Sequence, residues 1–246
     1  MRLIFGDGKL GTELATQTNW KIVSRKQDGI DITKPHTYEH VLMYNDNLEI
    51  VNCMGHVKTL DNTKDLHWKI NYVAVIDLVN MCNLYNVKLI HISSDFIYGL
   101  SKEFATEEDI PVHYPQWYIY TKLLADGYIQ AKANNYLLIR ASFKENPFPY
   151  SEAFEDLNGN FDYINVIANK IIKLIELNEK GVFNVGTEFK NMYELAKQTK
   201  SGVTPVLKKD HYTYDINVTM DTKKYENCTN KLSSTFPTKG TIFKNT

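Results

Sequence analysis

Short apolar runs alternate with longer stretches of helical spacing along most of the chain. Strands that are apolar throughout are typical of a parallel sheet covered by helices on both faces. Right-handed crossovers between such strands give a Rossmann-type, doubly wound α/β fold, which we predict here. The predicted strands are residues 2–5, 21–23, 48–52, 88–92, 136–139 and 181–185. The predicted helices are residues 12–18, 71–85, a segment that begins near Trp117, and 166–177.

The periodicity weakens toward the C-terminus, where Lys, Thr, Asn and Tyr become more frequent. We expect residues 1–143 to form a Rossmann core, with the helix and strand of 162–186 packing on it. Residues 144–161 and 187–246 are expected to form a smaller, substrate-side lobe, with a frayed tail after about Lys231. No internal repeat interrupts this division.

Composition restricts the class of partner. The 246 residues carry a formal net charge of −1, which favours neither a nucleic acid polymer nor an acidic membrane surface. No apolar stretch approaches the roughly 20 residues of a membrane span. Cys53, Cys82 and Cys228 are few and lack metal-ligand spacing, as in a reducing compartment. A strand that begins beside Met1 leaves no room for a signal peptide, so we expect a cytoplasmic protein. The sequence leaves a homodimer open.

A glycine-rich turn follows the first predicted strand. Gly6, Gly8 and Gly11 form a G-x-G-x-x-G pattern between that strand and a helix. Glycines at these positions allow a tight turn and let the backbone approach a pyrophosphate at the helix N-terminus. The position of the pattern in an alternating chain predicts a dinucleotide site; the alternative is a glycine-rich turn without a ligand.

The end of the second strand indicates which dinucleotide is bound. An NAD site usually has an acidic residue there, whereas this chain has Arg25 and Lys26 and no carboxylate before Asp28. Two cations suit a 2′-phosphate, and Arg25 can also lie over an adenine ring. We therefore predict NADPH, with NADH as an alternative cofactor and a solvated basic loop as the alternative interpretation.

Tyr118 and Lys122 open the helix near Trp117 and share one of its faces, because they are four residues apart. The lysine ammonium is expected to lower the pKa of the phenol by favouring its ionised form. Ser94 follows the strand 88–92 and would bring a hydroxyl to the same cleft. Together these groups predict a proton-donating site beside a polarised carbonyl, the chemistry of a ketone reductase.

The Tyr-x-x-x-Lys spacing alone is a weak signal. Only the pair at Tyr118 follows a serine at a strand end, at a distance that fits one loop and a helix start. We expect the other tyrosines to lie in a turn or to pack inward from amphipathic helices. The other pairs are Tyr98/Lys102, Tyr128/Lys132 and Tyr193/Lys197.

At this point the chain resembles the extended short-chain dehydrogenase/reductases, most closely the dTDP-4-dehydrorhamnose reductases. The segments that carry the resemblance are GDGKLG (6–11), DIT (31–33), VNCMGHVKTLD (51–61), HISSDFIYG (91–99) and YIYTKLLADG (118–127). Weaker echoes are LIRASF (138–143), GVFNVG (181–186) and INVTMDTKKYE (216–226). The resemblance runs nearly from end to end, and it implies NADPH-dependent reduction of a nucleotide-linked 4-keto-6-deoxy sugar.

The resemblance also implies roles for single residues. Ser94 takes the catalytic Ser/Thr position, Tyr118 that of the general acid, and Lys122 that of its partner, which also holds the nicotinamide ribose. Phe143 stands where the family often has Trp beside the sugar, and Asp95 and Phe96 are placed with Ser94 on the substrate side. The other cofactor-contact positions are Lys9, Leu10, Asp31, Ile32, Cys53, Met54, Gly55 and Asn71.

The chain departs from the family after Phe143, where the segment that covers the sugar nucleotide is short. This shortening predicts a more open pocket. It also leaves open a binding role like that of the regulatory subunit of methionine adenosyltransferase. A bifunctional epimerase and reductase is the third alternative, for which His113 is a weak candidate. We expect structural roles for His56 in a loop and His91 in a strand.

Overall fold

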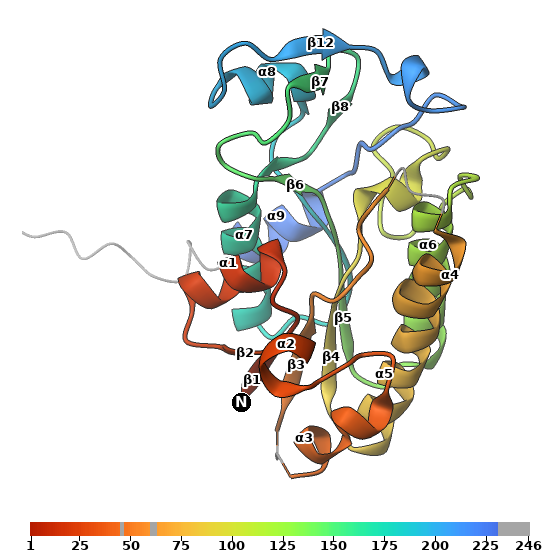
Figure 1. Cartoon of the computed structure of the whole chain (residues 1–246), viewed down its shortest axis with the longest axis vertical. Coiled ribbons are helices and arrows are strands. Elements are labelled where there is room, and N and C mark those ends of the chain that lie inside the picture. Colours follow the sequence, from red (N-terminus) through yellow and green to blue (C-terminus); the bar gives the residue numbers. More distant parts are fainter. Residues whose placement is uncertain (45–46, 60–62, 231–246) are drawn as a thin grey trace, which may run out of the picture.

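The computed structural model describes residues 1–44, 47–59 and 63–230. Its centre is a parallel sheet of six strands in the order β10–β5–β4–β3–β1–β2 (Figure 1). The strands are β1 (Arg2–Phe5), β2 (Lys21–Val23), β3 (Glu49–Asn52), β4 (Lys88–Ile92), β5 (Tyr136–Ala141) and β10 (Gly181–Val185). The doubly wound, Rossmann-type sheet predicted from the apolar runs is thereby confirmed.

Helices cover both faces of the sheet (Figure 1). One face carries α1 (Lys9–Gln17), α7 (Ile164–Glu176) and α9 (Lys223–Asn230). The other carries α3 (Glu39–Met43), α4 (Lys64–Leu66), the π-helical segment η2 (His67–Val73), α5 (Ala74–Leu84) and α6 (Trp117–Lys132). The short α2 (Arg25–Asp28) and the 3₁₀ turn η1 (Pro35–Thr37) follow β2.

Two predicted helices begin earlier than expected. The helix expected at 12–18 begins at Lys9, directly after the Gly8 N-cap, because the glycine turn leads straight into it. The helix expected at 71–85 is continuous with α4 and η2, so it begins at Lys64. Its first turns lack a strong apolar repeat, and π-helical turns are often found at functional sites.

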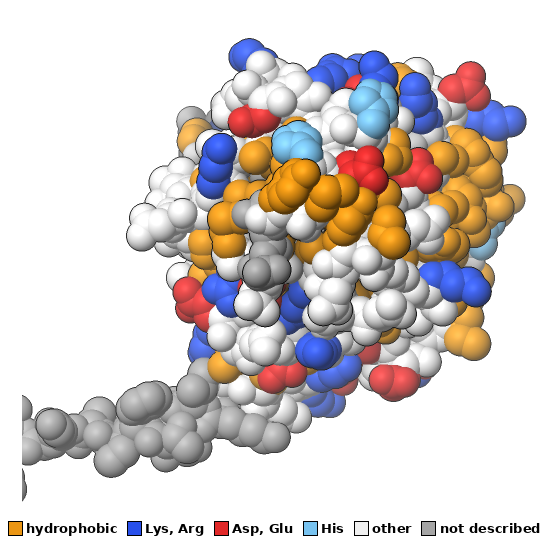
Figure 2. Space-filling model, turned by 90° about the horizontal axis from the view of Figure 1, so that it is seen from below, with side chains coloured by type: hydrophobic (Ala, Val, Ile, Leu, Met, Phe, Trp, Pro, Cys, Tyr) orange, Lys and Arg blue, Asp and Glu red, His pale blue; other side chains and the backbone are white. Residues whose placement is uncertain are grey.

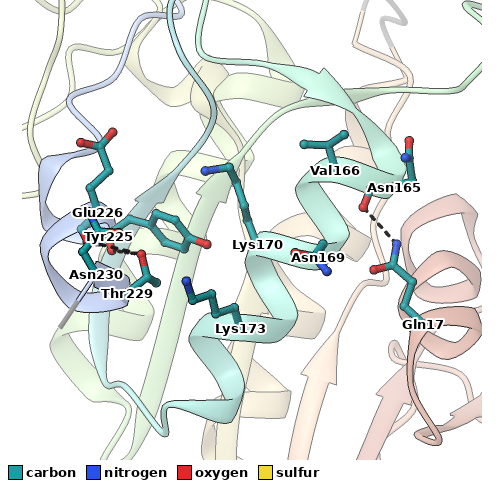
Figure 3. Close-up of a pocket in the computed structure, with 10 residues that line it drawn as sticks. All are labelled: Gln17, Asn165, Val166, Asn169, Lys170, Lys173, Tyr225, Glu226, Thr229 and Asn230. Carbon is teal, nitrogen blue, oxygen red and sulfur yellow. Dashed lines mark hydrogen bonds between the residues drawn. The ribbon is translucent and has the colours of Figure 1, made fainter. Parts of the chain in front are cut away.

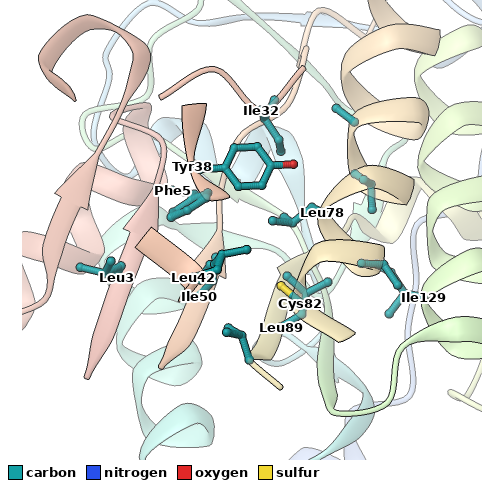
Figure 4. Close-up of a cluster of buried hydrophobic side chains, with 14 of the residues drawn as sticks. Leu3, Phe5, Ile32, Tyr38, Leu42, Ile50, Leu78, Cys82, Leu89 and Ile129 are labelled. Atoms are coloured by element: carbon teal, nitrogen blue, oxygen red, sulfur yellow. The ribbon is translucent and has the colours of Figure 1, made fainter. Parts of the chain in front are cut away.

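The core consists of two apolar clusters, one on each face of the sheet. Figure 4 shows part of the first, where Phe5 and Tyr38 pack edge to face with ring centroids 5.8 Å apart. The second joins β1, β4, β5 and β10 to α7, whose buried side chains recur at intervals of three and four residues, as on one face of a helix.

A smaller lobe lies above the carboxyl ends of the strands (Figure 1). It is built on two-residue and three-residue strand pairs and has an aromatic-rich cluster of its own. Its elements are β6 (Phe143–Lys144), β7 (Glu152–Phe154), β8 (Asn158–Gly159), β9 (Asp162–Tyr163), β11 (Lys190–Asn191), α8 (Met192–Lys197), β12 (Thr204–Val206) and η4 (Lys208–Asp210). The expected tail after Lys231 lies outside the described residues.

The strand order reverses at β1, which pairs with β2 on one side and β3 on the other. The loops that leave β1 and β3 therefore diverge and open a crevice at the carboxyl end of the sheet. Ligands of doubly wound folds bind in such crevices.

The surface seen from below carries acidic and basic side chains around a band of hydrophobic ones (Figure 2). This mixture agrees with the near-zero net charge of the sequence. Within residues 1–44, 47–59 and 63–230, no helix has the length and apolar character needed to cross a membrane. The same residues contain no cluster of His, Cys, Asp and Glu able to hold a metal ion.

Candidate active site

A cavity of about 870 Å³ lies between the carboxyl ends of the strands and the smaller lobe. Its wall contains Ser94, which follows β4, and Tyr118 and Lys122, which belong to the first turns of α6. The wall also contains Lys9 and Leu10 of α1. The structure thus brings the predicted serine, tyrosine and lysine to the same cavity as Lys9 and Leu10, which lie within the glycine-rich segment.

Ser94 is held at the N-terminus of the 3₁₀ turn η3 (Asp95–Tyr98). Its hydroxyl oxygen accepts a hydrogen bond from the Phe96 N–H at 3.2 Å, and its hydroxyl donates to Asp95 Oδ1 at 3.1 Å. Both contacts are local, so the short sequence after β4 fixes the direction of the side chain.

The environment of Tyr118 differs from the sequence-based expectation. Burial raises the pKa of Tyr118 to about 12; the nearby Ser94 side chain opposes the rise, and the negative charges of Asp95 and Asp126 reinforce it. The prediction that Lys122 lowers this pKa is therefore wrong for the structure as it stands. Removing a phenolate from water costs more than the nearby Ser94 side chain recovers.

Lys122 is also buried, with 6% of its surface exposed. Its ammonium group donates to the Ile92 carbonyl at 2.8 Å and contacts His91 Nε2 at 3.3 Å. Burial lowers the pKa of Lys122 to about 8, although Asp126 and Cys53 favour the charged form. The lysine is thus poised to ionise close to neutral pH.

The glycine turn after β1 is tightly folded. Gly6 has a φ of +114°, a value that residues with a side chain rarely adopt. A Cβ atom at Gly11 would lie 2.0 Å from the Gly6 carbonyl oxygen, so α1 can approach the turn only because residue 11 is glycine. A Cβ at Gly8 would meet nothing within 4 Å, which leaves the outer side of the turn open to a ligand.

The loop after β3 supplies the facing wall. Cys53, Met54, Gly55 and Asn71, the residues expected at cofactor-contact positions, all line the cavity. The Asn71 amide fixes the loop, because it accepts from the His56 N–H at 2.7 Å and donates to the His56 carbonyl at 3.0 Å. Burial raises the pKa of the Cys53 thiol to about 12, so this cysteine is protonated.

Seven of the predicted cofactor residues are not part of the cavity wall: Gly6, Gly8 and Gly11 in the turn after β1, and four residues after β2. Arg25 and Lys26 are exposed on α2, after the Ser24 N-cap. Asp31 accepts hydrogen bonds from Thr33, and Ile32 belongs to the apolar core. These four residues lie beyond β2, where the adenosine half of a bound dinucleotide is expected.

Some of the residues predicted for the substrate side line the cavity and others do not. Phe96 and Phe143 line the cavity, whereas Asp95 is fully buried behind Ser94. Burial raises the pKa of Asp95 to about 6, while Lys144 opposes the rise. Asp95 therefore orients Ser94 in this structure.

The sequence analysis missed most of the wall that the smaller lobe supplies. Its side chains are largely aromatic, and they gather only when three short strand pairs form. Aromatic residues between prolines at 147–150 were the only signal. The principal members are Phe148, Tyr150, Phe154, Met192, His211 and Tyr212.

An ion pair joins the two sides of the cavity mouth. The Lys9 ammonium contacts the Glu145 carboxylate, and both residues line the cavity together with Lys144. The pair connects the start of α1 to the short segment after β6, which the sequence predicted to leave the pocket open. That segment lines the cavity despite its length.

The other Tyr-x-x-x-Lys pairs are not part of the cavity wall among the described residues. Tyr98 donates to Asn184 Oδ1 at 3.0 Å within the core, and Tyr128 donates to Asn80 Oδ1 at 3.0 Å. The Lys197 ammonium lies over the ring of its own partner, Tyr193. His113, considered for epimerase chemistry, packs against Tyr120 with ring centroids 4.7 Å apart.

A second hollow, of about 660 Å³, lies among α1, α7 and α9 (Figure 3). Gln17 donates to the Asn165 carbonyl at 3.0 Å across it, and the Lys170 ammonium lies 4.8 Å from the ring centroid of Tyr225. None of the residues predicted for catalysis or cofactor binding lines this hollow. The predicted chemistry therefore belongs to the larger cavity.

Solved structures share the fold over nearly the whole chain. The dTDP-4-dehydrorhamnose reductase of Bacillus anthracis in complex with NADP has a TM-score of 0.78 at 19% identity, covering 96% of this chain and 99% of its own. The corresponding enzyme of Clostridium acetobutylicum has a TM-score of 0.75 at 19% identity, with coverages of 95% and 99%. The UDP-rhamnose synthase of Acanthamoeba polyphaga mimivirus has a TM-score of 0.71 at 15% identity, with coverages of 98% and 95%.

At these low identities, the structural likeness shows a common fold. None of the curated proteins compared with the chain matches it. Residues 1–172, more than two thirds of the sequence, match the family described as the RmlD substrate binding domain. This range contains the glycine turn, the strand-end serine and the Tyr–Lys pair described above. The chain belongs to the RmlD substrate binding domain family.

Proposed function

We propose that the protein is an NADPH-dependent reductase of a nucleotide-linked 4-keto-6-deoxy sugar. The observation that carries the proposal is the presence of Ser94, Tyr118 and Lys122 in the wall of one cavity, together with Lys9 and Leu10 of the glycine-rich segment. Family membership supports it. So do the names of the similar structures, which are sugar-nucleotide enzymes, one of them in complex with NADP.

The residues present fit a dinucleotide. The open side of the turn at Gly8 leaves room for a pyrophosphate, and Lys9, now paired with Glu145, is the neighbouring cation. The loop from Cys53 to Gly55, with Asn71, would hold the nicotinamide half. We assign Arg25 and Lys26 to the 2′-phosphate, which distinguishes NADPH from NADH. When bound, the cofactor supplies hydride to the C4 carbonyl carbon.

The chain's own groups handle the proton. Tyr118 donates its phenolic proton to the developing alkoxide, and its raised pKa keeps it protonated until that charge appears. Ser94 has a single hydroxyl hydrogen, which turns from Asp95 Oδ1 to donate to the same oxygen. Lys122 would hold the ribose, and in its ammonium form, below a pKa of about 8, it places a positive charge beside the phenol. Phe96 and Phe143 pack against the sugar, behind which Asp95 orients Ser94.

The decisive experiment follows the absorbance of NADPH when dTDP- or UDP-linked 4-keto-6-deoxyglucose is added. We expect absorbance to fall, and Tyr118→Phe to slow the reaction by roughly 10²–10⁴ with little change in cofactor affinity. Tyr128→Phe is the matched control, because it removes a phenol from the same helix outside the cavity.

Two outcomes would contradict the proposal. Wild-type turnover in Tyr118→Phe would show that another group donates the proton. Tight binding of NADPH without consumption, across both substrates, would favour the binding role known from the regulatory subunit of methionine adenosyltransferase. Epimerisation is not proposed, because His113 is absent from the described cavity wall.

We further infer a division of labour along the chain. Residues 1–143, with 162–186, would form the cofactor side, and 144–161 with 187–246 the substrate side. The strand pairs of the smaller lobe and its share of the cavity wall support this division. A cytoplasmic location and a homodimer remain predictions.

A further inference from the structure

A chain of buried polar groups runs behind the cavity wall. Asn52 ends β3, His91 lies in β4, and Lys122 lies in α6. Asn52 and His91 are fully buried, and Lys122 is only 6% exposed. Asn52 Nδ2 lies 3.0 Å from His91 Nδ1, and His91 Nε2 lies 3.3 Å from Lys122 Nζ. Water cannot readily replace these contacts, so their hydrogen-bond directions must agree with one another.

The backbone fixes the orientation of the Asn52 side-chain amide. The Met54 N–H donates to Asn52 Oδ1 at 3.1 Å, so the oxygen of that amide faces the backbone and its NH₂ group faces His91. An NH₂ group can only donate, and His91 Nδ1 must therefore accept. A neutral imidazole that accepts at Nδ1 carries its hydrogen on Nε2. The fold thus selects one tautomer of His91.

That tautomer presents a donor to Lys122. The Nε2–H points at Nζ, where an ammonium has only donors to offer, whereas a neutral amine has a lone pair that can accept. The Lys122 amine still donates to the Ile92 carbonyl at 2.8 Å. Four contacts link the Met54 N–H, Asn52, His91, Lys122 and the Ile92 carbonyl. Each of them has one donor and one acceptor only when Lys122 is a neutral amine.

We propose that Asn52 and His91 are positioning residues that favour the neutral amine of Lys122 over its ammonium form, by presenting Nε2–H to Nζ. The lowered pKa of Lys122 and the strongly lowered pKa of His91, both caused first by burial, agree with this arrangement. The charged form is favoured by Asp126, one turn along α6, and by Cys53 after β3. Asp126 is itself paired with Arg140 at 3.1 Å, which weakens its effect.

The catalytic consequence rests on the proposed function. Tyr118 passes its proton to the substrate oxygen and is left as a phenolate, which an ammonium at Lys122 stabilises. Below its pKa of about 8, Lys122 already carries this charge before the reaction, so no proton has to be supplied to it. The tautomer of His91 would therefore set the pH range in which the phenol works.

The test begins with the ring nitrogens of His91 in the full, cofactor-free chain. Nitrogen-15 NMR distinguishes a protonated from an unprotonated ring nitrogen, and the His91→Gln variant assigns the signals. We expect hydrogen on Nε2 and a bare Nδ1 in the wild type. Hydrogen on Nδ1 would overturn the proposal even if the protein consumes NADPH, and a protein without turnover would leave this measurement unaffected.

Two variants then test the link to Lys122, whose side-chain NMR signals report its ionisation. Asn52→Asp can accept from both Met54 N–H and an Nδ1–H, which inverts the tautomer and lets Nε2 accept from an ammonium. We expect the ionisation pH of Lys122 to rise by about 1–2 units. Asn52→Leu frees the tautomer without adding charge and should raise it in the same direction. A rise confined to Asn52→Asp would show a direct charge effect and would overturn the proposal.

Discussion

Burial controls the charges of single residues in the cavity wall. It raises the pKa of Tyr118 to about 12 and lowers that of Lys122 to about 8, so both groups shift toward their neutral forms. Relative to the ordinary values of 10.0 for tyrosine and 10.5 for lysine, the two pKa values exchange order and move apart. The phenol therefore stays a proton donor throughout the neutral range. A protonated phenol is what the reductive direction requires.

The lowered pKa of Lys122 predicts a pH-dependent stability. Between about pH 8 and the ordinary value of 10.5, the unfolded chain binds a proton at this lysine that the folded chain does not. The free energy of unfolding therefore gains up to about 1.4 kcal/mol per pH unit from Lys122 as pH rises through this window. Denaturant unfolding of the wild type and of Lys122→Met across this range measures the difference.

Other lysines contribute to the slope in both proteins, so only the difference is informative. Lys132→Ala, an exposed lysine at the end of the same helix, is the control and should leave the slope unchanged. Equal slopes in wild type and Lys122→Met would show that Lys122 keeps its ordinary ionisation when folded.

Sequence reasoning reached Ser94, Tyr118 and Lys122 because local rules place them: a strand end, a helix start and a spacing of four residues. It did not reach the direction of the pKa shift of Tyr118. That direction depends on how much protein surrounds the phenol, which no local pattern encodes. For the same reason His91 was expected to be structural, although it contacts Lys122.

At the scale of elements, the glycine turn and α1 form one unit. The start of α1 at Lys9 depends on the close approach of Gly11 to Gly6. The pattern of glycines predicted this turn from sequence alone, since Gly6 has a positive φ and Gly11 approaches the Gly6 carbonyl closely. The early start of the helix at Lys64 was not predicted, because the π-helical turns of η2 depart from the 3.6-residue repeat.

The variant Gly11→Ala tests this unit. Its Cβ would overlap the Gly6 carbonyl oxygen, so α1 must shift away from β1 at a cost of about 1–3 kcal/mol. We expect lower thermal stability and weaker NADPH binding, measured by thermal unfolding and by titration of the cofactor.

Gly127→Ala is the matched control in α6, where an added Cβ meets nothing within 4 Å. That change should stabilise the protein by roughly 0.5–1 kcal/mol, because alanine favours helix. Unchanged NADPH affinity in Gly11→Ala would show that the glycine turn is not part of the cofactor site.

At the scale of the whole molecule, the cavity has one wall that the sequence predicts, from the sheet side, and one that it does not, from the smaller lobe. The six-stranded sheet follows from apolar runs that report burial on both faces. The opposite wall depends on strand pairs of two or three residues, such as β8 with β11, whose partners are far apart in sequence. Runs so short carry no periodicity, so Phe154 and His211 could not be assigned to the wall beforehand.

Cofactor choice is tested on the intact protein. A ligand at 100 times its dissociation constant stabilises the folded state by about 2.7 kcal/mol, so NADPH should raise the unfolding temperature more than equal NADH. The double variant Arg25→Ala/Lys26→Ala should remove that preference while leaving stabilisation by NADH intact. Lys132→Ala again serves as the control for loss of an exposed cation. A preference that survives the double variant would place the 2′-phosphate elsewhere.

The cavity wall runs from Lys9, near the start of the chain, to Tyr212, close to the end of the described residues. During translation, Tyr118 and Lys122 therefore leave the ribosome long before Tyr212 is synthesised. A nascent chain can complete its glycine turn and hold a dinucleotide while the place for a sugar still lacks one side. The chain would then be able to bind the cofactor earlier in its synthesis than it is able to enclose the sugar.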